Sequence, residues 1–119
     1  MTMEFYQMGA VETKFAQIIW EHEPVRSTEL VALAAKELNW KKSTTFTVLR
    51  RLCEKGIVQN VNSIVTSVMS PEQYATAQSM QFVKDTFDDS LPAFLAAFSA
   101  GRKLSSKEVE ELRHLIEEQ

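Results

Sequence analysis

The chain has 119 residues, a formal net charge of −3 and 45% hydrophobic residues. This hydrophobic content excludes a wholly disordered chain, and the length allows one modest core, or one small domain with an appendage that needs a partner. No apolar run is long enough to cross a bilayer and the start lacks a secretory-signal pattern, so we expect a cytoplasmic protein without membrane insertion.

A first amphipathic helix is predicted near the amino terminus. Its apolar residues recur at helical spacing, as Val11, Phe15, Ile18 and Ile19, and Pro24 ends it because proline cannot continue a helix. We expect this helix to contribute mainly to the core.

The stretch from Ser27 to Gly56 is typical of a helix-turn-helix. Ser27 is expected to cap the first of its two helices, Asn39 and Trp40 form the corner, and Gly56 suits a left-handed residue that closes the second helix. Each helix has one apolar stripe, made by Leu30, Leu33, Ala34 and Leu38 in the first and by Thr45, Val48, Leu49 and Leu52 in the second. Cys53 follows that stripe and is expected to be a buried small hydrophobic residue.

The opposite face of the second helix carries groups that can meet phosphates and base edges. The candidate DNA-binding residues are Lys41, Lys42, Ser43, Thr44, Thr47, Arg50 and Arg51, with Lys55 at the helix end. Two other interpretations stand beside this one: the cluster is a solvated helix face, or Arg51 braces the fold by pairing with Glu54 or Glu12.

The charge is distributed unevenly along the chain. Residues 1–70 hold eight Lys or Arg and seven Glu, a net charge of +1, whereas residues 71–119 hold five basic and nine acidic residues, a net charge of −4. Residues 41–55 alone hold five basic residues and one acid. A local positive patch on an acidic chain is compatible with phosphate contact, and we expect the acidic remainder to face away from DNA.

Two β-branched runs, 57–61 and 64–68, flank Asn62–Ser63 and predict a short antiparallel hairpin. Three helices followed by such a hairpin form a winged helix. The predicted fold class is therefore mainly α, with a winged helix-turn-helix domain over residues 1–70, a short β-hairpin wing, and a helical dimerisation domain over residues 71–119.

The carboxy-terminal part is predicted to be helical and to need a partner. Ser70, Pro71 and Gln73 make a strong helix start, and Ser105 with Glu108 forms a capping box for the last helix. Thin helices of this length leave apolar faces uncovered, so we expect a homodimer that binds a palindromic operator. The candidate dimerisation residues are Phe87, Leu91, Phe94, Leu95, Phe98, Val109, Leu112, Leu115 and Ile116.

No pattern in the sequence indicates an enzyme, a cofactor or a metal site. His22 and His114 have no partner at metal-ligand spacing, and no nucleophile–base pair or phosphate-binding glycine loop is visible. A run of phenylalanines, Phe82, Phe87, Phe94 and Phe98, is open to two interpretations, a ligand pocket or the dimer core, and its helical spacing favours the core.

With these residues in view, the chain resembles the penicillinase-repressor family of winged-helix regulators. Its first-helix pattern includes Glu12, Trp20 and Pro24, and its tail includes Phe87–Ser90 and Leu104–Leu112. The second-helix pattern is kept only loosely, as Ser27, Thr28, Glu29 and Leu30. The third-helix pattern of the family is present as Trp40, Thr44, Thr47, Val48, Leu49, Arg51, Leu52, Lys55 and Gly56. The resemblance implies a dimeric repressor, with Thr44, Thr47 and Arg51 facing DNA.

Three departures from the family pattern concern the wing, the third helix and induction. The family wing has a Gly-Arg turn, whereas this chain has Asn62–Ser63 and no basic residue between Gly56 and Ser70. Phe46 replaces the usual Lys or Gln and is either a thymine-methyl contact or a packed side chain. The Asn-Phe bond cleaved in the beta-lactam branch corresponds to Ala97–Phe98, and the paired C-x-C motifs of the copper branch are absent.

Two functions from different classes follow from the sequence. The first is a dimeric transcriptional repressor that binds a double-stranded DNA operator through its third helix and is released by a protease or sensor of unknown identity. The alternative is a winged-helix protein–protein adaptor that has lost sequence-specific DNA reading, as the reduced wing allows.

Overall fold

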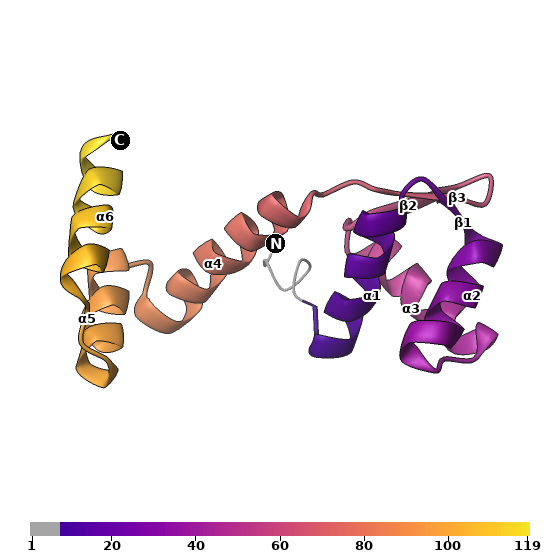
Figure 1. Ribbon diagram of the computed structural model, residues 1–119, viewed down its shortest axis with the longest axis horizontal. Coiled ribbons are helices and arrows are strands. Elements are labelled where there is room, and N and C mark those ends of the chain that lie inside the picture. Colours follow the sequence, from indigo (N-terminus) through magenta and orange to yellow (C-terminus); the bar gives the residue numbers. More distant parts are fainter. Residues whose placement is uncertain (1–7) are drawn as a thin grey trace. The chain divides into compact units, whose positions relative to one another are not determined.

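The computed structural model describes residues 8–119, which form six helices and one small sheet (Figure 1). The chain divides into two compact units between Gln81 and Phe82, inside the fourth helix. The elements in chain order are α1 (Ala10–His22), β1 (Val25–Arg26), α2 (Ser27–Leu38), α3 (Lys42–Glu54), β2 (Val58–Val61), β3 (Ile64–Ser67), α4 (Pro71–Phe87), α5 (Leu91–Gly101) and α6 (Ser106–Glu117). This arrangement confirms the predicted mainly α fold, a winged helix with a β-hairpin wing followed by a helical tail. No helix among residues 8–119 meets the length and hydropathy of a membrane span.

The predicted helix-turn-helix is present as α2 and α3. Asn39 turns the chain between them in the left-handed conformation, with φ of 58°, and Gly56 follows α3 with φ of 79°. The predicted cap of α2 was wrong by one position, because the cap residue is Arg26 and Ser27 is the first, buried residue of the helix. The Arg26 backbone N–H donates to the Glu29 carboxylate at 3.3 Å, which gives α2 its start without a Ser27 side-chain bond.

The predicted hairpin is present, and a third strand joins it. Asn62 and Ser63 both have positive φ, 53° and 65°, as a two-residue turn between twisted strands requires. The sheet order is β1-β3-β2, with all neighbours antiparallel. Strand β1, which the sequence did not indicate, pairs Val25 with Val65 and Arg26 with Ile64.

The core of the first unit lies between α1, α2, α3 and the sheet. Phe15, Ile19, Leu30, Leu52 and Val65 have no exposed surface, and the four predicted stripe residues of α3 are buried. Half-buried Trp20 and Trp40 pack against this core. Trp20 donates its indole N–H to the Met69 carbonyl at 2.9 Å, and the Trp40 ring lies 5.1 Å from that of Phe15.

The start of α4 is fixed by the predicted capping residues. Ser70 Oγ accepts from the Gln73 N–H at 3.0 Å, and the Gln73 side chain accepts from the Ser70 N–H at 2.9 Å. One turn later, Tyr74 is buried in the core of the first unit, where its hydroxyl accepts a hydrogen bond from the Met8 N–H at 2.9 Å. The first turns of α4 therefore pack as part of the winged-helix unit.

The second unit is built from the end of α4 with α5 and α6. Asp88 and Asp89 make the turn before α5 with φ of 53° and 66°, and Ser90 caps α5 by accepting from the Ala93 N–H. The predicted Ser105–Glu108 capping box is present at α6, with hydrogen bonds of 2.9 and 3.1 Å. No residue of α5 or α6 is buried, so this unit has packing contacts but no enclosed core.

Candidate nucleic-acid interface

All seven candidate DNA-binding residues lie together and are exposed. Lys41 precedes α3 as its cap, and Lys42, Ser43, Thr44, Thr47, Arg50 and Arg51 lie along the helix with their side chains on the solvent side. The apolar stripe of Thr45, Val48, Leu49 and Leu52 fixes this orientation, because burying that stripe leaves the other face outward. The structure therefore presents cations and hydroxyls on a rigid helix.

The hydroxyls of this face differ in their local bonding. The Thr47 hydroxyl lies 2.9 Å from the Ser43 carbonyl oxygen, to which it donates, and Thr45 donates to the Lys41 carbonyl at 3.1 Å. Thr45 is buried, whereas Thr47 is exposed. A Thr47 hydroxyl that donates back to its own helix keeps its oxygen lone pairs directed outward as acceptors, while rotation of the hydroxyl releases it as a donor.

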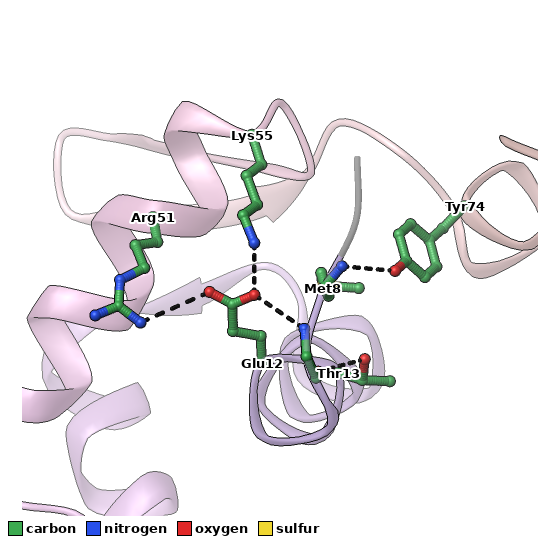
Figure 2. Close-up of polar contacts among 7 residues, drawn as sticks. Met8, Glu12, Thr13, Arg51, Lys55 and Tyr74 are labelled. Atoms are coloured by element: carbon green, nitrogen blue, oxygen red, sulfur yellow. Dashed lines mark hydrogen bonds and ion pairs between the residues drawn. The ribbon is translucent and has the colours of Figure 1, made fainter. Parts of the chain in front are cut away.

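A carboxylate from α1 meets the far end of α3 (Figure 2). Glu12 Oε1 lies 2.6 Å from Lys55 Nζ, and Glu12 Oε2 lies 3.8 Å from Arg51 Nη1. Of the two acids that the sequence offered as partners of Arg51, Glu12 is the one that pairs with it. Lys55 is thus turned toward α1, while Arg51 remains largely exposed.

The surroundings of Glu12 act on its pKa in both directions. Burial raises the pKa, whereas hydrogen bonds from Lys55 and from the Gly9 N–H, with the charges of Lys55 and Arg51, lower it, and the net effect is a lowered pKa. Glu12 is therefore ionised at neutral pH and carries a full negative charge beside α3.

Phe46 and Cys53 line a hollow beside the exposed face of α3. Phe46 is half-buried and packs against the core, which supports its interpretation as a packed side chain. Cys53 is also only half-buried, which corrects the expectation of a buried residue, and burial together with the charge of Glu54 raises the pKa of its thiol. The hollow is completed by Leu49, Arg50 and Asn60.

The structure brings to the wing a cation that the sequence did not place there. Arg26 in β1 lies opposite Ile64 in β3, and the Ser27 N–H donates to the Ser63 carbonyl at 2.9 Å, directly at the hairpin turn. Arg26 is exposed. The sequence predicted no basic residue in the wing because the hairpin itself contains none. The β-branched Val25 before Arg26 favours a short strand and was the one local signal for β1.

The nine candidate dimerisation residues all lie in the second unit. Phe82, Phe87 and Phe94 form a cluster of edge-to-face rings, with centroids 5.6 to 6.0 Å apart. Leu91, Phe98, Val109, Leu115 and Ile116 are exposed, by 39% to 61%. A hollow between α5 and α6 is lined by Phe94, Leu95, Phe98, Leu112 and Leu115 together with charged residues at its edge. The Ala97–Phe98 bond lies inside α5, with both residues exposed.

The fold of the first unit, together with the exposed face of α3, defines a winged helix-turn-helix, a class of DNA-binding regulator. The sequence profile of the penicillinase repressor family matches residues 8–118, and the chain belongs to that family. It is 24% identical over 116 residues to the penicillinase repressor of Bacillus licheniformis, covering 94% of this chain and 91% of the relative. It is 22% identical over 120 residues to the methicillin resistance regulatory protein MecI of Staphylococcus aureus strain Mu50, covering 98% of each. The predicted family is confirmed.

Proposed function

We propose that this chain represses transcription as a homodimer in which α3 of each subunit enters the major groove of a palindromic operator. The observation that carries the proposal is the outward display of seven cationic and hydroxyl-bearing residues along one helix whose other face is held in the core. Membership of a repressor family supports the regulatory outcome. A repressor bound to DNA in a bacterium works in the cytoplasm, which is the compartment we propose.

The candidate residues divide into two roles in this proposal. Lys41, Lys42 and Arg50 are flexible cations suited to phosphates, which position the protein without carrying sequence information. Thr44, Thr47 and Arg51 are suited to base edges, because a hydroxyl both donates and accepts and a guanidinium can donate twice to guanine. Ser43 lies in the first turn of α3, where a hydroxyl and free backbone N–H groups suit a phosphate oxygen.

Dimerisation is supported by the second unit. Five of its nine candidate residues are exposed although each belongs to a helical stripe: Leu91, Phe98, Val109, Leu115 and Ile116. A stable protein interface needs roughly 1,000 Å² of buried surface. A second copy offers the same apolar stripes in return, so a two-fold contact covers both sets at once. The two-fold axis then spaces two α3 helices for half-sites about one turn of DNA, or a multiple, apart.

Affinity for DNA measured across a range of salt concentrations tests the proposal. The probe is a duplex enriched from a random-sequence pool by the wild-type protein, hereafter the selected duplex. We expect log affinity to fall linearly with log salt concentration, with a slope of about −0.9 per phosphate neutralised. Thr47→Ala and Arg51→Ala should weaken binding by about tenfold each and leave dimer formation intact.

The matched control is Lys36→Gln, which removes an exposed cation from the end of α2. A protein that enriches no duplex, or whose binding is flat across salt, is not the proposed repressor and fits the alternative of a protein–protein adaptor. Equal affinities of the wild type, Thr47→Ala and Arg51→Ala would remove α3 from the contact.

A further inference from the structure

Among residues 8–119, the ion pairs at the end of α3 join one acid, Glu12, to two cations, Lys55 and Arg51, at different distances. Glu12 from α1 has only 12% of its side chain exposed, and the Lys55 side chain is 25% exposed. Their charged atoms lie 2.6 Å apart, a short charge-assisted hydrogen bond. The Arg51 side chain is 58% exposed, and its nearest nitrogen is 3.8 Å from the same carboxylate, beyond hydrogen-bond distance.

The two cations also compete for one acid. Arg51 and Lys55 are four residues apart, so they lie one turn apart on the same side of α3, and Figure 2 shows both directed toward Glu12 from that helix. The N–H of Gly9, the N-cap residue of α1, donates to the same Glu12 oxygen as Lys55, at 3.2 Å, and helps to hold the carboxylate in place. The short ion pair with Lys55 compensates most of the cost of shielding the Glu12 charge from water. The longer contact of Glu12 with Arg51 is therefore weak.

We propose that Glu12 and Lys55 act as positioning residues for DNA binding: Lys55 neutralises Glu12 and thereby leaves the Arg51 guanidinium available to the duplex. This inference rests on the proposed function, because it assumes that α3 meets DNA. In the free protein Arg51 makes a long ion pair with Glu12, and when the protein binds DNA Arg51 leaves Glu12 and contacts the duplex. Lys55 stays with Glu12 and touches no phosphate.

The proposal predicts that removing Lys55, which does not touch DNA, weakens DNA binding. If Lys55 neutralises Glu12, then removing Lys55 leaves a shielded carboxylate whose remaining ion-pair partner within residues 8–119 is Arg51. Glu12 then holds the arginine that DNA would otherwise bind. Loss of a residue that does not touch DNA therefore removes the contact of a residue that does. Removing Glu12 as well releases Arg51 again.

The experiment is a set of binding curves with the full-length protein, the selected duplex and an unrelated duplex across a salt series. The variants are Lys55→Gln, Glu12→Gln/Lys55→Gln, Arg51→Ala and Arg51→Ala/Lys55→Gln. The control is Glu54→Gln/Lys55→Gln, since Glu54 is an exposed acid next to Lys55 in the sequence and its removal restores the same net charge as removal of Glu12. Circular dichroism melts identify a temperature at which every variant is folded.

We expect Lys55→Gln to weaken binding of the selected duplex about tenfold, the same loss as for Arg51→Ala, and to reduce the preference for it over an unrelated duplex, because Arg51 is assigned to a base edge. Glu12→Gln/Lys55→Gln should regain most of the wild-type affinity and preference, whereas Glu54→Gln/Lys55→Gln should not. In the Arg51→Ala background, Lys55→Gln should have almost no further effect, because its action passes through Arg51.

Three results would overturn the inference while leaving the proposed function intact. The first is wild-type affinity of Lys55→Gln. The second is a loss from Lys55→Gln that adds in full to that of Arg51→Ala, which would mean that Lys55 contacts DNA itself. The third is equal recovery of both double variants that lack an acid, which would mean a general charge effect. The Arg51→Ala/Lys55→Gln comparison keeps the test decisive even if Glu12→Gln fails to fold. A wild-type protein without salt-dependent binding contradicts the proposed function instead.

Discussion

The winged-helix unit and the helical tail use similar apolar residues in opposite ways. In the first unit, four large apolar side chains are completely buried, those of Phe15, Ile19, Leu30 and Leu52. They belong to one core that α1, α2 and α3 form with the sheet. In α5 and α6 no residue is buried, although their stripes have the same three-and-four spacing. Spacing alone therefore predicts which residues share a face, while burial depends on whether enough chain is present to cover that face.

The largest expected effect comes from a cavity in the winged-helix core. Leu52→Ala should lower the free energy of unfolding by about 2–5 kcal/mol, because Leu52 has no exposed surface and the truncated site cannot collapse fully. Denaturant unfolding followed by circular dichroism measures the loss. Leu115→Ala, the same change at a residue 59% exposed in the tail, should leave the winged-helix transition unchanged. Equal losses in both variants would break the contrast between the units.

A charge in the tail should act on assembly. Leu112 is half-buried between α5 and α6, and Leu112→Asp would bring an unpaired carboxylate into the proposed contact between subunits. We expect the dimer dissociation constant to rise by about a hundredfold, and operator affinity to fall with it. Sedimentation equilibrium measures the change, with Lys107→Asp at an exposed position of α6 as the control. An undisturbed Leu112→Asp dimer would place the interface elsewhere.

Loss of the α6 cap should have a smaller effect confined to the tail. Ser105 Oγ accepts from the Glu108 N–H at 3.1 Å, and Ser105→Ala removes this bond at a cost of about 1 kcal/mol. The expected reading is faster amide hydrogen exchange in α6, with exchange in α1 to α3 unchanged. Ser106→Ala, one position into the helix, is the matched control. Uniformly faster exchange in both units would show that they unfold as one.

The smallest expected effect concerns Arg26, the exposed cation that β1 brings beside the wing. If it touches a phosphate, Arg26→Gln should reduce the magnitude of the salt slope by about 0.9 per subunit and weaken selected and unrelated duplexes to the same extent. Lys36→Gln, at the other end of α2, should leave the slope unchanged. A slope unaltered by Arg26→Gln would leave the wing without a cationic contact.

Much of the local structure in both units was predictable from local signals. The hairpin turn at Asn62–Ser63, the left-handed Asn39 and Gly56, and the capping residues of α4 and α6 each depend on neighbours in the sequence, and each is present. The α3 stripe was predictable for the same reason, since helical spacing fixes which residues share a face.

Contacts between distant segments were harder to predict. Strand β1 is two residues long and depends on pairing with Val65 and Ile64, and its one local signal, the β-branched Val25, is too weak to predict a strand by itself. The same strand moved the start of α2, because Ser27 is buried and its backbone N–H is bonded to Ser63. Glu12 was one of two acids offered for Arg51, and only the packing of α1 beside α3 distinguished it from Glu54. The assignments to DNA contact and to dimerisation stay predictions.

The central claim is that the exposed face of α3 meets DNA, and an NMR titration of the isotope-labelled protein with the selected duplex tests it most directly. The account predicts large amide shifts from Lys41 to Arg51, with residues of α6 unaffected. Tight binding that leaves the α3 amides unshifted would contradict it.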